Sequence, residues 1–313
     1  MMISEKMDAG DPRAADKTPT SLVERFRRWT SAHRGVTMRT LDHYEYDLRP
    51  FLAKLGDDPA RYDVAGVRDF LLEHLRDRGR GQAKQTLSAV RALLRFLAAE
   101  GHCHPDFAAA LPRVPQWRLS ALPRYLEPEV VERVIASCDL TTPRGLRDRA
   151  VLLLLSRLGL RAGDIVAMRL VDLDWEAGAL RVCGKGRREA ALPLTQEMGD
   201  ALLAYLERGR ERVALESVFL GAHPPFRPFH SSVAVSAIVR SALRRAGVHD
   251  APSRGAHLLR HSAATAMLRA GGTLESIAMV LRHRSTLTTA HYAKVDVRML
   301  LEVVQPWPAG AAC

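Results

Sequence analysis

The sequence predicts a mainly α-helical protein with one small β-sheet, divided into two domains. Apolar residues recur at the three-to-four spacing of a helix face over most of the chain, which favours helices. A stretch with prolines at positions 105, 112, 115 and 123 separates two such helical regions, as linkers between domains do. Two short segments of strand-like composition flank a glycine-rich turn, in the second region only.

The first domain is expected over residues 19–104, after a flexible arm at 1–18. Ser21 begins its first helix, because Glu24 lies three residues later and completes a capping box. Pro50 falls inside the second apolar stripe and should kink that helix. Two further amphipathic stretches follow with short turns between them. The domain is therefore predicted to be a compact four-helix bundle.

The second domain is expected over residues 125–313, after a linker at 105–124. Residues 146–158 are apolar on nearly every side, which predicts the buried central helix of this domain. Residues 180–183 and 190–192 are predicted to form a β-hairpin around the turn Gly184-Lys185-Gly186. Further helices are expected at 128–137, 197–206, 232–246, 258–270, 274–281 and 297–304.

Charge and composition indicate an acidic partner. The net charge is +11 at neutral pH and the pI is near 10, and the excess of lysine and arginine is spread over both halves of the chain. This distribution fits a clamp around a polyanion better than a basic tail. The four cysteines lie far apart, so neither a disulfide framework nor a cysteine metal site is expected. Because the opening residues are polar and no apolar run could span a bilayer, a cytoplasmic protein is expected.

Two cationic side chains stand where the local sequence would hold or project them. Arg161 directly follows the apolar helix, and a guanidinium fixed there suits bidentate contact with a phosphate. The alternative is a helix-end arginine paired with Asp164. Lys185 lies between two glycines at the hairpin tip, where it could reach a ligand or be solvated as most turn lysines are.

Two further clusters combine histidine with arginine or tyrosine. His257 and Arg260 lie three residues apart on one helical face, so they can converge on one ligand. His257 and His261 could instead hold a metal, but no carboxylate or cysteine at helical spacing completes such a site. His283 precedes Tyr292 by nine residues, enough for a turn and a short helix that return the phenol to the same place. The alternative for Tyr292 is a half-buried core tyrosine.

The four clusters together resemble the active-site pattern of the tyrosine recombinase, or phage integrase, family, which includes the Xer-type recombinases. The resemblance covers about residues 20–305, and it implies a SAM-like core-binding domain followed by a mixed α+β catalytic domain. A Thr-Thr pair ahead of the tyrosine and the apolar helix before Gly-Leu-Arg match as well. The matching residues, separated by gaps of 24, 72, 3, 23 and 9, are Arg161, Lys185, His257, Arg260, His283 and Tyr292.

The resemblance implies an enzyme that breaks and rejoins DNA without a cofactor, a metal or ATP. Tyr292 would attack a phosphodiester and form a 3′-phosphotyrosyl intermediate. Arg161 and Arg260 would stabilise the charge that develops on the phosphoryl oxygens, and His283 would add a hydrogen bond. His257 would act as the base for a phenol whose ordinary pKa is about 10. The hairpin lysine would protonate the departing 5′ oxygen.

The implied partner is double-stranded DNA carrying a specific recombination site, bound by a homotetramer on two duplexes, with accessory recombinase subunits as a further class of partner. The final helix, at 297–304, would dock on a neighbouring subunit or pack on its own domain. Asp164 stands where the family usually has glutamate and should keep the structural acid. DNA contacts are expected at Arg187, Arg240, Arg244, Arg245 and Arg282.

Position 282 is the clearest departure from the family pattern, which commonly has glycine before the histidine. If this position requires a positive φ, Arg282 strains the turn. Three other functions remain open on the sequence: a type IB-like topoisomerase that rejoins the same strand, a catalytically silent DNA-binding or directionality protein on the same scaffold, and a basic helical protein without enzymatic activity.

Overall fold

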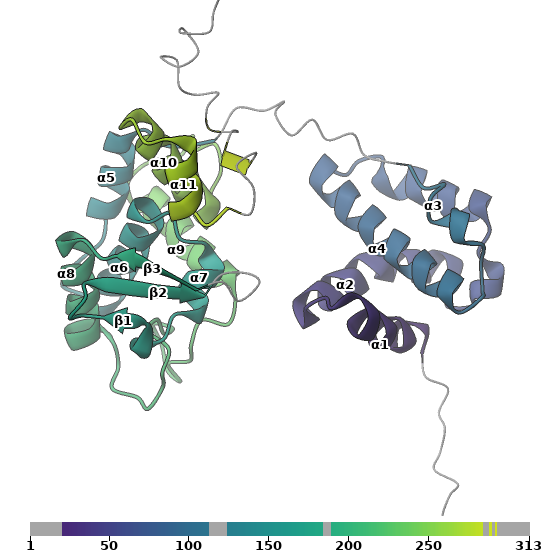
Figure 1. The fold of residues 1–313 in the computed structure, drawn as a ribbon, viewed down its shortest axis with the longest axis horizontal. Helices are drawn as coiled ribbons and strands as arrows, with labels where there is room; N and C mark the ends of the chain where they lie inside the picture. The colour runs from purple at the N-terminus through teal and green to yellow at the C-terminus, as the bar shows by residue number, and fades with distance from the viewer. Residues whose placement is uncertain (1–20, 113–123, 184–188, 284–287, 290–291, 293–313) are drawn as a thin grey trace, which may run out of the picture. The chain divides into compact units, whose positions relative to one another are not determined.

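The computed structural model describes residues 21–112, 124–183, 189–283, 288–289 and 292. They fall into two compact units, with the division between residues 116 and 117, and each unit is described by itself (Figure 1). Within the described ranges, no helix is long and apolar enough to cross a membrane.

The N-terminal unit is a bundle of four helices, as the amphipathic stripes predicted. At the start of the first helix, Ser21 Oγ accepts from the Glu24 N–H and the Glu24 carboxylate accepts from the Ser21 N–H, so the predicted capping box is present. The second helix continues through Pro50. The fourth helix packs against the first two, and its Leu94 is fully buried. The helices are α1 (Leu22–Arg34), α2 (Met38–Leu55), α3 (Val64–Leu75) and α4 (Arg80–Ala99).

The second unit is built around one helix, α6 (Pro143–Arg157), whose residues 150–155 are all buried. This confirms the central buried helix predicted for the region. Thr142 caps α6 and Pro143 occupies its first position, where the missing N–H of proline costs nothing. Helices α5 (Pro128–Ala136), α8 (Gln196–Ala204), α9 (Ser232–Arg245) and α10 (Ala256–Arg269) all contact α6.

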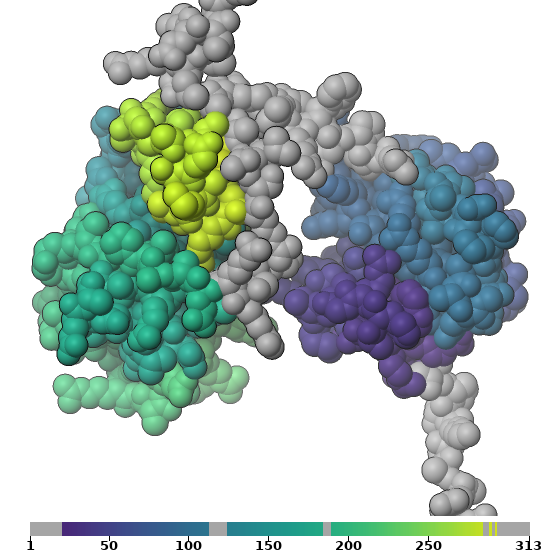
Figure 2. Space-filling model, in the orientation of Figure 1, coloured from purple at the N-terminus to yellow at the C-terminus, as the bar shows by residue number. Residues whose placement is uncertain are grey.

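The last described helix, α11 (Leu274–Val280), packs against α10. It lies on the surface of the unit, in yellow-green in Figure 2, and exposes Met279 to solvent. The predicted helix at 297–304 lies outside the described residues.

A three-stranded antiparallel sheet completes the second unit: β1 (Leu173–Asp174), β2 (Ala179–Cys183) and β3 (Glu189–Pro193). The register of β2 with β3 runs from Ala179 opposite Pro193 to Cys183 opposite Glu189, which confirms the predicted hairpin; its tip, at 184–188, lies outside the described residues. The strand β1 and the helix α7 (Ala162–Ala167) were not predicted. Elements of two and six residues are too short for a periodic signal.

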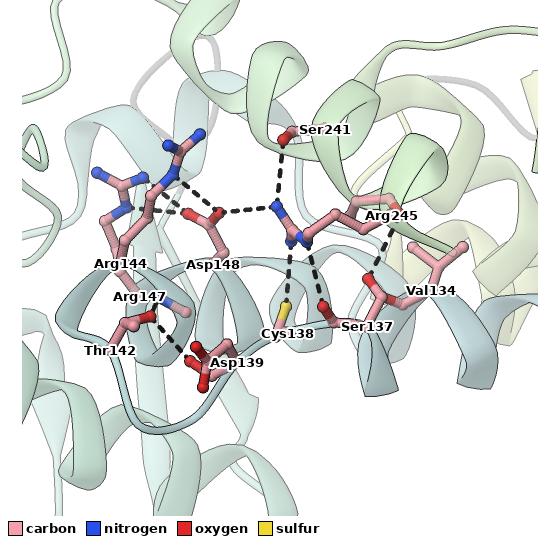
Figure 3. Close-up of polar contacts among 12 residues, drawn as sticks. Val134, Ser137, Cys138, Asp139, Thr142, Arg144, Arg147, Asp148, Ser241 and Arg245 are labelled. Atoms are coloured by element: carbon pink, nitrogen blue, oxygen red, sulfur yellow. Dashed lines mark hydrogen bonds and ion pairs between the residues drawn. The ribbon is translucent and has the colours of Figure 1, made fainter. Parts of the chain in front are cut away.

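A buried acid in α6, Asp148, connects three parts of this unit. Its side chain is 1% exposed, and its Oδ1 accepts from Arg147 Nε and Nη2 at 3.1 and 2.7 Å. Arg144 and Arg245 each place a guanidinium nitrogen 3.8 Å from Oδ2 (Figure 3). Arg147 also donates from Nη1 to the carbonyl oxygen of Leu220 at 3.0 Å. We refer to Arg144, Arg147, Asp148 and Arg245 as the Asp148 cluster.

Arg245 extends this cluster from the end of α9 to the end of α5. Its Nε donates to the carbonyl oxygen of Ser137 at 3.1 Å, and its Nη2 lies 3.6 Å from the Cys138 sulfur. Its Nη1 donates to Ser241 Oγ at 3.1 Å (Figure 3). These contacts fasten three helices together at one point.

Candidate active site

Arg260 is a buried arginine whose acceptors are main-chain carbonyls rather than acids. It projects from α10 and is 3% exposed. Its Nη1 donates to the carbonyl oxygen of Gly159, and its Nη2 to that of Leu281 at 2.5 Å. These bonds hold the guanidinium between the end of α6 and the end of α11 while leaving its charge uncancelled. Burial, with Arg161 nearby, lowers the pKa of Arg260 to about 10, so it remains charged at neutral pH.

Gly159 has the backbone conformation that this contact requires. Its φ is +58°, in the left-handed region, and a Cβ built there would lie 2.4 Å from Cδ2 of Leu281. Both facts favour glycine at this position. The backbone conformation and the close packing therefore explain why residue 159 of the Gly-Leu-Arg sequence is glycine.

Arg161 approaches the same region from the start of α7. Its N–H donates to Asp164 Oδ2 at 2.8 Å, and its Nη2 donates to the carbonyl oxygen of Arg282 at 2.7 Å. The guanidinium that pairs with Asp164 is that of Arg282. The carboxylate thus caps α7 and connects it to the turn before His283. We refer to Arg161, Asp164, Arg260 and Arg282 as the Arg260 cluster.

Arg282 does take the left-handed conformation that glycine would favour. Its φ is +52°, which confirms the strain expected at this position. Its side chain is 9% exposed and is turned inward against Asp164, and its Nε and Nη1 have no hydrogen-bond partner among the described residues. The guanidinium of Arg282 therefore lies inside the protein in this conformation, and its contact with DNA stays a prediction.

The phenol of Tyr292 is buried and hydrogen-bonded to a histidine. Tyr292 is 2% exposed and packs with Leu281 and other apolar residues of α10 and α11. Its hydroxyl lies 2.7 Å from Nδ1 of His261, and the two ring centroids are 5.5 Å apart. Burial raises the pKa of the phenol, and the charge of Arg260 offsets part of this rise.

The ring of His283 also lies near this tyrosine. Its ring stacks on that of Tyr292 with centroids 6.3 Å apart and planes inclined by 6°. Its Nδ1 lies 2.8 Å from Thr289 Oγ1. Burial, together with the charges of Arg260 and Arg161, lowers the pKa of His283 to about 4. The imidazole is therefore neutral at physiological pH.

His257, in the first turn of α10, keeps its side chain exposed. Its ring centroid is 5.9 Å from that of His261. Partial loss of water around the ring and the charges of Arg260 and Arg161 lower the pKa of His257, so it too is a neutral donor or acceptor at neutral pH. The imidazole that contacts the phenol is His261, whereas we had expected His257 to be the base.

The structure thus brings together five of the six residues singled out in the sequence: Arg161, His257, Arg260, His283 and Tyr292. The sixth, Lys185, lies outside the described residues. Two fixed guanidiniums beside a phenol and neutral imidazoles provide anion stabilisation, a nucleophile and proton acceptors in one place. Their catalytic roles are argued below as a proposal.

The expected DNA contacts have separate outcomes. Arg187 lies outside the described residues. Arg240 and Arg244 are exposed on α9, where a polyanion could reach them. Arg245 is exposed, but its guanidinium is bonded to Ser137 and Ser241 and lies 3.8 Å from Asp148; its contact with DNA stays a prediction.

Sequence reasoning missed two residues of this site. His261 was considered only as a metal ligand, although its position four residues after His257 also signalled a shared helix face. Thr289 was noted only as part of a Thr-Thr pair, and its bond to His283 depends on a tertiary contact. Within the described residues, no group of three histidine, cysteine or acidic side chains is placed to hold a metal ion.

Comparison with known proteins places this geometry in a family context. The Phage integrase family model matches residues 124–299. The chain is 39% identical over 304 residues to the putative integrase/recombinase y4rA of Sinorhizobium fredii, covering 95% of this chain and 74% of that protein. It is 33% identical over 289 residues to the tyrosine recombinase XerD of Xanthomonas axonopodis pv. citri, covering 88% and 93%.

Solved structures show the same fold. The XerH site-specific recombinase bound to its palindromic difH substrate, in a post-cleavage complex, matches with a TM-score of 0.70 at 19% identity, covering 90% of this chain and 83% of that one. A lambda integrase tetramer bound to a Holliday junction matches with a TM-score of 0.65 at 18% identity, covering 87% and 76%. The predicted fold class, a helical domain plus a mixed α+β domain, is confirmed.

Proposed function

Because the chain belongs to the phage integrase family, it is a site-specific tyrosine recombinase, and we propose that it breaks and rejoins DNA with Tyr292 as the nucleophile. The phenol oxygen attacks a phosphodiester, the bond from phosphorus to the 5′ oxygen breaks, and a 3′-phosphotyrosyl enzyme forms. One phosphoester replaces another, so the bond energy is kept for rejoining and no ATP is consumed.

One observation carries this proposal: two buried or half-buried arginines are held by carbonyl oxygens, and the charge of one of them, Arg260, acts on the phenol of Tyr292. Arg260 donates to Gly159 and Leu281, and Arg161 donates to the carbonyl oxygen of Arg282. Preorganised cations of this kind stabilise the charge that grows on phosphoryl oxygens in the transition state. Removal of one such donor typically costs about 10²–10³ in rate.

The other residues receive roles by their position and chemistry. His257 and His283 are neutral imidazoles beside the two arginines, and we assign them hydrogen bonds to the phosphoryl oxygens. Lys185, from the hairpin between β2 and β3, is assigned as the acid that protonates the departing 5′ oxygen. Replacing that oxygen with sulfur, which leaves without a proton, should restore cleavage by Lys185→Ala; no restoration would assign the lysine another role.

The partner is double-stranded DNA with a specific site. We assign DNA contact to both units, with the helical N-terminal unit as the core-binding domain and the second unit as the catalytic domain. Exposed Arg240 and Arg244 are proposed phosphate contacts of the second unit. The assembly proposed on DNA is a homotetramer joining two duplexes, as in the lambda integrase complex, and the proposed location is the cytoplasm.

The deciding experiment uses a nicked suicide substrate from which the cleaved 5′ end diffuses away. Wild-type protein should accumulate a covalent protein–DNA adduct, and Tyr292→Phe should bind the DNA with similar affinity but form none. An adduct formed by Tyr292→Phe would remove this tyrosine as the nucleophile. Cleavage should persist in EDTA, because the arginines and not a metal carry the positive charge.

Two marked duplexes separate recombination from the topoisomerase alternative. A recombinase joins strands of different duplexes, and a topoisomerase only relaxes supercoils within one. Recombinant products with both markers are the expected result.

A further inference from the structure

The hydrogen bond between His261 and Tyr292 joins a residue without an assigned role to the proposed nucleophile. Nδ1 of His261 lies 2.7 Å from the phenol oxygen, within the reach that proton transfer requires. His261 lies one residue after Arg260 on α10, and so it is held by the same helix that positions the phosphate-binding arginine.

The phenol needs a proton acceptor at this place. Tyr292 is 2% exposed, so solvent cannot readily take its proton. Burial also raises the pKa of the phenol, and a phenol is mostly protonated at neutral pH even in water. A base in direct contact is the economical way to generate the nucleophile as the phosphorus–oxygen bond forms.

The geometry favours His261 over the other two histidines. Nδ1 of His283 is engaged by Thr289 Oγ1 at 2.8 Å, and its ring centroid lies 6.3 Å from that of Tyr292. His257 has its ring 5.9 Å from that of His261, and it is His261 whose Nδ1 lies within hydrogen-bond distance of the phenol oxygen.

We propose that His261 is the general base of strand cleavage, accepting the phenol proton on Nδ1 while Tyr292 Oη attacks phosphorus. The Oη–P bond forms, the bond from phosphorus to the 5′ oxygen breaks, and the leaving oxygen takes a proton from Lys185. In rejoining, the incoming 5′ hydroxyl returns its proton to Lys185, and His261 gives its proton back to the departing phenolate. Each cleavage and rejoining pair therefore leaves both residues as they began.

The charges around His261 are compatible with this role. Among the described residues, the titratable groups beside it are His257 and Arg260 from its own helix, Tyr292, and His283 from the turn after α11. His257 and His283 are neutral at physiological pH.

His261→Asn is the decisive variant, because its side-chain oxygen lies near the position of Nδ1 and can accept the same hydrogen bond but cannot take the proton. Single-turnover adduct formation on the suicide substrate should fall about 100-fold, with little change in DNA affinity. Wild-type rates in His261→Asn would overturn the proposal. Faster cleavage would also overturn it, because it would mean that His261 restrains the tyrosine.

Two further readouts separate a base from a structural contact. The cleavage rate of the wild-type protein should fall at acid pH and level off once the imidazole of His261 is neutral. The cleavage rate of His261→Asn should instead rise steadily with pH, because solvent base replaces the imidazole. Added imidazole should restore part of the activity of His261→Gly and should not affect His249→Ala, an exposed control. Absence of both effects would leave His261 without a role in proton transfer.

This inference rests on the proposed nucleophile, so Tyr292→Phe is tested alongside. Adduct formation by Tyr292→Phe would remove the nucleophile and the inference together. If Tyr292→Phe is inactive while His261→Asn keeps the wild-type rate, only the role of His261 is lost.

Discussion

Two clusters in the second unit contain the same side chains, three arginines and one aspartate, and use them differently. In the Asp148 cluster all three guanidiniums lie within 4 Å of the acid. In the Arg260 cluster the aspartate pairs with Arg282, while Arg161 and Arg260 donate to carbonyl oxygens. The two clusters have the same number of charged side chains, but the groups that accept hydrogen bonds from their arginines differ.

Whether an arginine donates to a carboxylate or to a carbonyl oxygen decides whether its charge remains available to a ligand. A carboxylate that accepts a hydrogen bond from an arginine also neutralises the charge of that arginine. Such a pair can hold two helices together. A carbonyl oxygen fixes the direction of a guanidinium and leaves its charge available to an anion. Arg147 and Arg260 illustrate the two cases: both are buried, and the second is the one that we propose binds a phosphate.

The largest expected effect compares lysine substitutions at these two arginines. Arg260→Lys keeps a charge but loses the planar fork that contacts two carbonyls, so single-turnover cleavage should fall about 10²–10³-fold. Arg147→Lys should lower the unfolding temperature and leave the rate per folded molecule within about twofold, because its partners are structural. Equal loss of cleavage in both variants, corrected for folding, would break the distinction between the clusters.

Asp148→Asn should cause the largest loss of stability. It leaves the buried guanidinium of Arg147 without its acid and removes the ion pairs of the more exposed Arg144 and Arg245; breaking a buried pair typically costs about 3–5 kcal/mol. For a unit of this size the unfolding temperature should drop by about 10 °C, as measured by calorimetry. Asp164→Asn provides the matched control. It should lower the unfolding temperature less than Asp148→Asn does, and it should lower the cleavage rate more. The reverse ranking would contradict the assignment of the two acids.

A moderate effect is expected from the titration of His283. Its pKa is about 4 in the folded protein and about 6.5 in an unfolded chain. Between these two values the unfolded chain binds more protons than the native state. The free energy of unfolding therefore has its full value above pH 6.5 and falls as the pH drops toward 4. Thermal unfolding between pH 7 and 4.5 should show a weaker pH dependence for His283→Asn than for the wild-type protein. Identical slopes would mean that His283 is not the group being titrated.

The smallest expected effect concerns the strained turn at Arg282. Arg282→Gly loses the pair with Asp164 but relieves the positive φ, whereas Arg282→Ala loses the pair and keeps the strain. Glycine should therefore be more stable than alanine at this position by about 1 kcal/mol. Denaturant unfolding measures the difference. An alanine variant as stable as the glycine variant would show that the turn relaxes.

Much of the fold could be predicted because its signals are local. The capping box at Ser21 and Glu24, the first-turn Pro128 and the all-apolar helix at 146–158 depend on neighbours in sequence. The two-residue strand β1 could not be predicted, because its only support is pairing with β2.

The site shows the same division between local and distant information. Spacing along α10 placed His257 and Arg260 on one face, and the family resemblance supplied the remaining members. The contacts of Arg245 could not be predicted, because its partners Ser137 and Cys138 lie more than 100 residues away. The contact of His261 with Tyr292 spans 31 positions and leaves no trace in the spacing of either residue.

The orientation of Arg260 depends on carbonyls that lie 101 and 21 positions away along the chain. Neither carbonyl is in place until the end of α6 and the end of α11 have both docked on α10. A partly assembled chain therefore carries the tyrosine without an organised phosphate clamp. Because the proposed cleavage needs this guanidinium, we expect DNA cutting only by molecules in which α6, α10 and α11 have packed together.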